Sequence, residues 1–224
     1  MKQFYCLLKI LAVYLVLSCS PLSQAQEDKI MERFDIETFN RNKSGYSWIH
    51  TLQDGSKVWE REIHGKGYQT ETTVPNSAYT DIKVFNYDGN LIATFLNFYN
   101  INIGVSKEYD GKGNVTKQYN QEEKFSFSID DLVKKMHDEF NVDIADTQKT
   151  KTIRRGLAII NGKEIPLYSV YNFFPEPGEK YIHKLMGYVI DGTTGEVLYS
   201  RHTNLDADPD VLGVYTELVE SGRL

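Results

Sequence analysis

The sequence predicts an α+β fold in which antiparallel strands dominate. Residues 46–124 consist of short runs that alternate apolar and polar side chains and are broken by Asp-Gly pairs, a pattern typical of β-hairpins. Residues 125–204 begin with apolar residues at helical spacing and continue with further strand-like runs. We therefore expect a hairpin-rich N-terminal half, followed by one amphipathic helix packed on an antiparallel meander.

The composition is that of a folded, acidic protein. The chain has 224 residues, of which 41% are hydrophobic, enough for the core of one domain or of two small ones. The 31 acidic residues exceed the 25 basic ones, which gives a net charge of −6. Because nucleic-acid binding depends on a basic surface, this charge argues against a nucleic-acid partner.

Residues 1–18 have the features of an export signal. The apolar run over residues 10–17 is too short to span a bilayer, since a spanning helix needs about 20 residues. The run ends in Val-Leu-Ser-Cys at residues 16–19, which resembles a bacterial lipobox and implies that Cys19 carries a lipid anchor. We expect a lipoprotein of the bacterial cell envelope, anchored in the outer membrane, that touches the membrane only through this lipid. The alternative is ordinary cleavage behind Ala25, which gives a secreted or periplasmic protein.

Export also determines what the cysteines can do. Cys6 leaves with the signal and Cys19 is lipidated or removed, so we expect no disulfide and no thiolate metal ligand in the mature chain. Loss of residues 1–18 removes two lysines and leaves 23 basic against 31 acidic side chains, a net charge of −8.

The segment that follows predicts a tether and then hairpins. Residues 19–45 are polar apart from Phe34, Ile36 and Phe39, which indicates a tether with a short first element. Within residues 46–124, turns are expected where Asp-Gly pairs separate apolar runs, because such turns need a positive φ. These turns are at residues 54–56, 88–90 and 110–114.

Two of these hairpins form a weak repeat. Residues 85–91 (Phe-Asn-Tyr-Asp-Gly-Asn-Leu) align with residues 108–115 (Glu-Tyr-Asp-Gly-Lys-Gly-Asn-Val), with Tyr87 matched to Tyr109 and two extra residues in the second turn. The motif resembles variant MORN repeats over about residues 80–120. That resemblance implies a scaffold in which aromatic side chains pack between hairpins and the turns close their ends.

A helix is predicted over residues 129–140. Its apolar residues recur on one helical face, Ser128 precedes them as an N-cap, and Asp130 and Asp131 occupy the first turn. Four strands and a short final helix should follow, at residues 151–160, 164–174, 181–190, 196–202 and within 205–224.

The last predicted hairpin carries a second resemblance. Residues 187–198 (Gly-Tyr-Val-Ile-Asp-Gly-Thr-Thr-Gly-Glu-Val-Leu) are similar to the closing hairpin of PepSY-like domains. This resemblance implies a helix-plus-sheet unit over residues 125–204. It also implies a role in binding or inhibition rather than in catalysis.

The sequence contains no recognisable catalytic or cofactor motif, and we predict no cofactor. The five histidines do not form a metal-spaced pair. One acidic cluster has the spacing of an EF-hand calcium loop, but Val211 stands where that loop needs glycine. The cluster consists of Asp206, Asp208, Asp210 and Glu217. The alternative, which we favour, is an acidic N-terminus to the final helix.

Two aromatic pairs are the candidate partner-binding residues. A strand buried on one face hides only alternate residues, so Phe98 beside Tyr99 and Phe173 beside Phe174 should each place one ring on the opposite face. The alternative is that the other half of the protein covers these rings.

The whole arrangement resembles small bacterial envelope lipoproteins and predicts a non-enzymatic module that binds or inhibits a protein partner. One specific version is an immunity protein against a periplasmic toxin, because an acidic surface speeds encounter with a basic partner. Two alternatives stay open. One is a structural or accessory component of an outer-membrane complex, and the other is a cell-wall or glycan-acting enzyme whose carboxylates the sequence does not locate.

Overall fold

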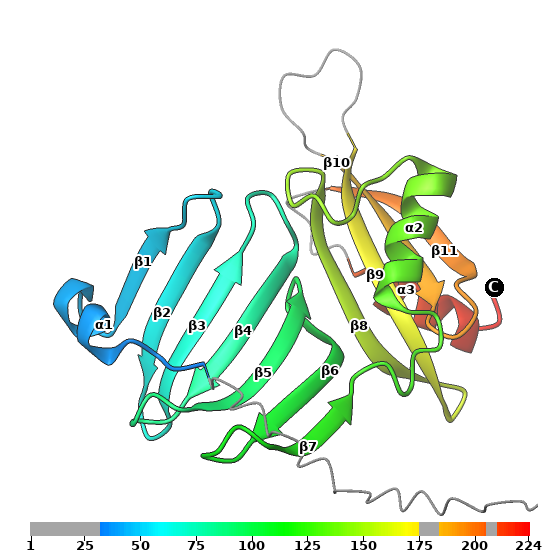
Figure 1. The fold of residues 1–224 in the computed structure, drawn as a ribbon. Coiled ribbons are helices and arrows are strands. Elements are labelled where there is room, and N and C mark those ends of the chain that lie inside the picture. The colour runs from blue at the N-terminus through cyan, green and yellow to red at the C-terminus, as the bar shows by residue number, and fades with distance from the viewer. Residues whose placement is uncertain (1–31, 175–183, 205–209) are drawn as a thin grey trace, which may run out of the picture. The chain divides into compact units, whose positions relative to one another are not determined.

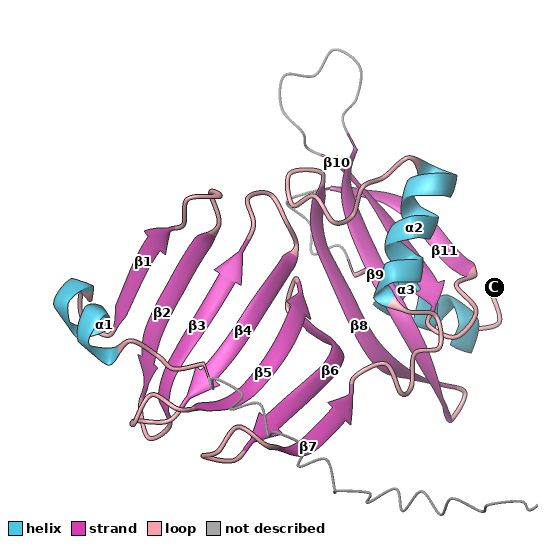
Figure 2. Ribbon diagram, in the orientation of Figure 1, coloured by secondary structure: helices cyan, strands magenta, loops and turns pink. Residues whose placement is uncertain are grey.

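The computed structural model describes residues 32–174, 184–204 and 210–224 (Figure 1). The predicted signal peptide and Cys19 lie outside the described residues. The described chain has an α+β fold with mostly antiparallel strands, which confirms the predicted fold class (Figure 2). All the described residues belong to one compact unit.

The described residues contain three helices and eleven strands. The helices are α1 (Ile36–Asn42), α2 (Ile129–Phe140) and α3 (Val211–Glu220). One sheet has the strand order of the chain: β1 (Ser47–Thr51), β2 (Lys57–Ile63), β3 (Gly67–Thr73), β4 (Tyr79–Phe85), β5 (Leu91–Phe98), β6 (Ile101–Tyr109) and β7 (Val115–Asn120). The other has the order β11-β10-β9-β8, from β8 (Thr150–Ile160), β9 (Lys163–Phe174), β10 (Lys184–Asp191) and β11 (Val197–Asn204). Within the described ranges, no helix is long and apolar enough to cross a membrane.

The seven-stranded sheet is a meander, and three of its six hairpins close at the predicted turns, at residues 54–56, 88–90 and 110–114. Gly55, Gly89 and Gly113 adopt φ values of 88°, 78° and 81°, a region that glycine enters without a steric penalty. The turn chemistry of the sequence thus set where these strands end.

The structure corrects the alignment of the repeat. Asn86 and Asp110 each accept, through a side-chain oxygen, hydrogen bonds of 2.8–3.0 Å from the backbone N–H groups two and four residues later. The two turns therefore have the same length, and neither contains extra residues. Tyr109 corresponds to Phe85 at the end of a strand, whereas Tyr87 lies inside its turn. The predicted match of the two tyrosines was wrong because the Asx side chain, not the aromatic ring, organises the turn.

One face of the seven-stranded sheet, here called the covered face, is packed at both ends. At one end, α1 and the residues before it form an aromatic cluster with the sheet. Its buried members are Phe34, Phe39, Tyr68, Phe85 and Leu91. At the other end, the same face joins the core beneath α2.

The four-stranded sheet lies between α2 and α3. Alternate residues of β9 point to opposite sides, so Tyr168 and Val170 pack on the α2 side, while Leu167 and Tyr171 pack on the α3 side. Helix α2 has the predicted bounds, and Ser128 caps it within a reciprocal capping box. Gly187 permits the close approach of α3, because a side chain at this position would overlap Val211.

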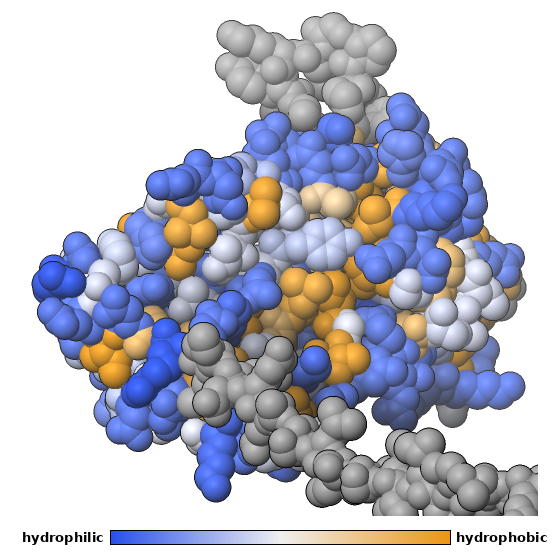
Figure 3. All heavy atoms as spheres, in the orientation of Figure 1, coloured by the Kyte–Doolittle hydropathy of each residue, from blue (hydrophilic) through white to orange (hydrophobic). Residues whose placement is uncertain are grey.

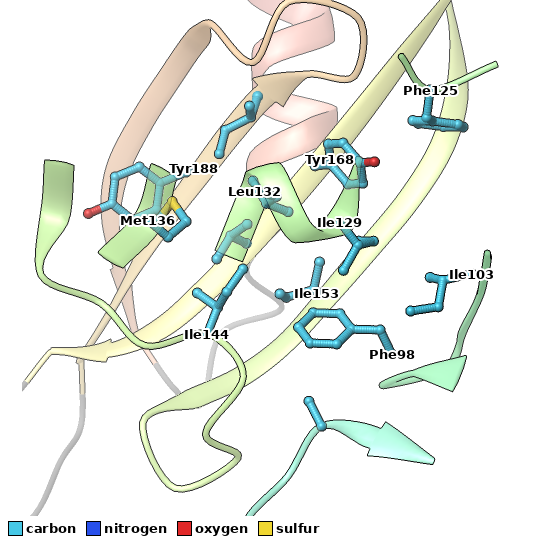
Figure 4. Packing of buried hydrophobic residues seen from close by; sticks show 13 residues of the cluster. Phe98, Ile103, Phe125, Ile129, Leu132, Met136, Ile144, Ile153, Tyr168 and Tyr188 are labelled. Atoms are coloured by element: carbon cyan, nitrogen blue, oxygen red, sulfur yellow. The ribbon is translucent and has the colours of Figure 1, made fainter. Parts of the chain in front are cut away.

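A single core joins the two sheets (Figure 4). It contains Phe98 and Ile103 from the seven-stranded sheet, Leu132 and Met136 from α2, and Ile153 from β8. We call this region the junction. On the face shown in Figure 3, apolar side chains gather where the seven-stranded sheet meets the α2 side of the molecule.

Ionic and polar contacts fix the junction at its rim. The Arg155 side chain is 7% exposed and donates to a Glu122 carboxylate oxygen at 2.7 Å. It also donates to the backbone carbonyl oxygens of Asn102 and Gln121. Glu122 in turn accepts from the Gly104 N–H at 3.0 Å, so one ion pair links β8 to β6 and to the segment after β7.

Candidate functional site

The first predicted aromatic pair lies in the junction. Phe98 is fully buried, and Tyr99 is partly buried against the same core. The two rings pack edge to face at 5.3 Å between centroids. The Tyr99 hydroxyl lies 3.2 Å from the carbonyl oxygen of Ile144. Strand alternation does not apply to this pair, because Tyr99 begins the turn after β5 with a φ of 52°. The expectation of an outward ring is therefore not met, and the other half of the protein covers the pair.

The second pair offers no exposed ring that the structure describes. Phe173 is partly buried against the core on the α3 side of the four-stranded sheet. The side chain of Phe174 lies outside the described residues.

The two described members of the acidic cluster, Asp210 and Glu217, have different partners and do not form a common site. Asp210 caps α3 by accepting a hydrogen bond from the Gly213 N–H at 2.8 Å. Glu217 pairs with Arg223 at 2.6 Å. Asp206 and Asp208 lie outside the described residues. Among the side chains that are described, no group of three His, Cys, Asp or Glu residues could hold a metal ion.

The second face of the seven-stranded sheet is the candidate functional site. We call it the open face, because none of the hydrophobic clusters of the described residues includes its side chains. Directly paired residues of neighbouring antiparallel strands lie on the same face, so the register defines rows across the sheet. The central row crosses five strands and consists of Ile49, Trp59, Glu71, Ile82 and Phe95.

A second row lies beside the central one and crosses all seven strands. It consists of Ser47, Arg61, Gln69, Val84, Ala93, Glu108 and Lys117. Together the two rows hold six apolar and six polar side chains, and the apolar ones dominate only the central row. The rows also contain Trp59, Phe95 and Arg61, and aromatic residues and arginine are enriched in protein interfaces.

The polar side chains of the open face are held in fixed positions. Arg61 donates to Glu71 at 2.9 Å, and the Gln69 amide donates to the same carboxylate oxygen at 2.7 Å. The Arg61 guanidinium lies 4.4 Å from the centre of the Trp59 ring. Because the carboxylate is paired and the guanidinium is stacked, the surface presents Trp59 in a defined orientation.

The apolar exposure is greatest around β1. Tyr46, Ile49 and Leu52 are 77%, 68% and 44% exposed, and Trp59, which pairs with Ile49, is 37% exposed. Of these, Ile49 and Trp59 belong to the open face.

The covered face beneath β1 contains titratable groups. The Trp48 and His50 rings stack at 4.0 Å, and His50 lies 3.8 Å from Glu60. Burial raises the pKa of the Glu60 carboxyl above its usual value, while the neighbouring imidazole opposes that shift. A cavity of about 300 Å³ lies close by, lined by Tyr46, Glu62 and His64.

Sequence reasoning missed the open face because it searched for adjacent aromatic residues. Trp59 follows Val58 and Ile49 follows Trp48, so neither residue belongs to a pair of adjacent aromatic rings. The sequence did contain one indication of this face, in the adjacent residues Val58 and Trp59. Neighbouring residues of a strand point to opposite faces, so β2 has an apolar residue on each face of the sheet.

No protein-family model matches the chain, and no curated protein sequence is significantly similar to it.

Proposed function

We propose that this protein is a non-enzymatic binding protein of the bacterial cell envelope, and that it holds a protein partner on the open face. The observation that carries this proposal is the polarity of the two central rows. The central row of the open face is apolar at all positions except Glu71. The central row of the covered face is polar at all positions except Trp48. That row consists of Trp48, Glu60, Thr70, Lys83, Thr94, Lys107 and Gln118.

This polarity is the reverse of what a solvated sheet needs. An antiparallel sheet with one face in water normally turns its polar side chains to that face. Apolar side chains gathered on a face that belongs to none of the hydrophobic clusters of the described residues therefore indicate an interaction surface. The buried Ile82 and the half-buried Phe95 continue the exposed pair Ile49 and Trp59 inward along the row.

The size and chemistry of the row favour a protein partner. Neighbouring strands are about 4.8 Å apart, so a row over five strands extends roughly 20 Å, more than a small ligand would cover. Trp and Arg are also the residue types that most often dominate the binding energy of protein interfaces. Trp59 and Arg61 stack on each other at the exposed end of the row.

The envelope location in this proposal is supported by the sequence of residues 1–19. Lipid attachment at Cys19 would keep the open face within reach of other envelope proteins. Labelling with a radioactive fatty acid should mark the wild-type protein and not Cys19→Ala. Recovery of the wild type as an unlabelled protein that begins at Gln26 would contradict the anchor and leave the binding proposal untouched.

The experiment that tests binding uses two pairs of residues with equal exposure. Ile49 and Trp59 are 68% and 37% exposed on the open face, whereas Ile159 and Leu157 are 68% and 38% exposed on β8. The double variants Ile49→Ser with Trp59→Ala, and Ile159→Ser with Leu157→Ala, remove similar exposed apolar surface at the two places. Each would be purified, immobilised and incubated with envelope proteins of the source bacterium, and the retained proteins quantified.

We expect one or a few proteins to be retained by the wild type and by the β8 variant. Retention of the same proteins should fall about tenfold or more with the open-face variant, the loss that follows removal of central interface residues. Thermal unfolding should show that both variants stay folded. Equal retention by the two variants would refute the open face as the binding site.

A further inference from the structure

The outer edge of β1 differs from the other sheet edges in the described part of the chain. Edge strands are normally protected by charged residues, proline or irregular backbone, because their unpaired N–H and C=O groups can pair with another strand. Charged side chains occur in the other three edge strands, as Lys117 in β7, Arg155 in β8 and Arg201 in β11. Strand β1 reads Ser-Trp-Ile-His-Thr and has no acidic or basic residue other than His50, no glycine and no proline.

The backbone of β1 shows which groups lie at this edge. The Glu62 N–H donates to the Tyr46 carbonyl and the Leu52 N–H donates to the Ser56 carbonyl, so the even-numbered residues of β1 point their backbone groups toward β2. The odd-numbered residues point theirs outward. Ser47 uses both groups in hydrogen bonds with Ser44.

Two residues of β1 therefore remain to pair with another chain. Ile49 and Thr51 direct one N–H and one C=O each away from β2. No strand of the described sheets pairs with them, because β1 ends its sheet.

We propose that β1 pairs with β1 of a second copy of this chain, in antiparallel orientation, about a two-fold axis at His50. In this register Ile49 lies opposite Thr51 of the second copy, and Thr51 lies opposite its Ile49. These two pairs use all four outward groups of each strand, and they need no group that the monomer already uses. The pairing between the two copies cannot extend to Ser47, because both backbone groups of Ser47 already form hydrogen bonds with Ser44.

The side chains of β1 are compatible with the same register. Trp48 comes to lie opposite Leu52 of the second copy, which covers a leucine that is 44% exposed in the monomer. Ile49 and Thr51 both lie on the open face, so the two open faces become one continuous surface. No lysine, arginine or carboxylate is brought opposite another within the paired segment, since β1 contains none of these residues.

The proposal goes beyond the partner-binding function, because it uses the edge of the sheet and not the open face. The paired segment is short, and the area it covers is well below the roughly 1,200 Å² at which stable complexes begin. We therefore expect a weak dimer, with a dissociation constant on the order of 10–100 μM. Its association should depend on protein concentration.

Cysteine cross-linking tests the register directly. In a non-hydrogen-bonded antiparallel pair the Cα atoms are about 4.5 Å apart, within the range of about 4.4–6.8 Å that a disulfide bridges. His50→Cys should therefore form a disulfide-linked dimer under mild oxidation. Gln118→Cys on the exposed edge strand β7 is the matched control and should stay monomeric, and the wild type corrects for the cysteines already present.

Sedimentation velocity of the purified protein between about 5 and 500 μM tests association without the cross-link. We expect the wild type to move from monomer to dimer over this range. Thr51→Pro removes an outward N–H that the fold does not use, and it should weaken association at least tenfold while thermal unfolding stays cooperative. A wild type that remains monomeric throughout, or a His50→Cys variant that cross-links no more than Gln118→Cys, would overturn the proposal. Neither result would affect retention of a partner on the open face, so the two proposals fail separately.

Discussion

The junction and the open face contain similar side chains in opposite settings. Phe98 in the junction is completely buried, whereas Trp59 on the open face is 37% exposed, although both project from strands of the same sheet. The same contrast holds for two Arg–Glu pairs. The side chain of Arg155 at the junction is 7% exposed, whereas that of Arg61 on the open face is 36% exposed. Residue type therefore does not decide whether a side chain is part of the core or remains at the surface. The element that packs on its face of the sheet decides.

The largest expected effect comes from truncating one aromatic ring in each region. Phe98→Ala should lower the free energy of unfolding by about 3–5 kcal/mol, because it leaves a cavity in a packed core. Trp59→Ala should lower it by about 1 kcal/mol or less, since it removes a partly exposed ring and its contact with Arg61. Urea denaturation of both variants measures the difference. Equal losses would mean that the open face is covered by part of this chain.

The second effect concerns the two ion pairs. Arg155→Met should cost about 2–3 kcal/mol, because it leaves Glu122 and two backbone carbonyls without their donor in a mostly buried site. Arg61→Met should cost less than about 1 kcal/mol, because the Arg61–Glu71 pair is screened by solvent. A double-mutant cycle with Glu122→Gln should show strong coupling to Arg155. Additive losses there would contradict the role of this pair in joining the sheets.

The smallest effect appears at alkaline pH. Burial raises the pKa of Tyr99 to about 12, and burial likewise raises the pKa values of Tyr79 and Tyr168 to about 12. In the unfolded chain a tyrosine ionises near pH 10, so the unfolded state loses its proton first. The stability that these groups provide is therefore fully present below about pH 10 and is lost as the pH rises toward 12.

Tyr99→Phe tests this linkage. Between about pH 9.5 and 11.5, the variant should lose roughly 1–2 kcal/mol less free energy of unfolding than the wild type loses. This difference is smaller than the pKa shift alone would give, because the ring is only partly buried. Tyr119→Phe on β7, where the tyrosine is 46% exposed, is the control for loss of a hydroxyl group at an exposed site. Denaturant midpoints measured across this pH range give the comparison, and parallel profiles for Tyr99→Phe and the wild type would rule out the burial effect.

The elements that the sequence predicted well are those with local causes. The bounds of α2 follow from helical spacing and from Ser128, whose hydroxyl accepts from the Asp131 N–H at 3.1 Å. The hairpin turns follow from glycines that adopt a positive φ, and the cap of α3 by Asp210 follows from its acidic start. Each of these depends on residues within about five positions of one another, so a single sequence contains the information.

The candidate site required the tertiary structure. Alternation in β5 shows that Phe95 and Phe98 face opposite sides of the sheet, but it does not say which side will be covered. That choice is made by α2, Ile144 and β8, which lie more than thirty residues further along the chain. In the same way, the strand order that leaves β1 at an edge exists only in the assembled sheet. Helix α2 and the turns at residues 54–56, 88–90 and 110–114 follow from the sequence alone, because they depend on local backbone preferences. The tertiary structure alone decided which aromatic side chains are core and which are surface, because burial depends on long-range packing.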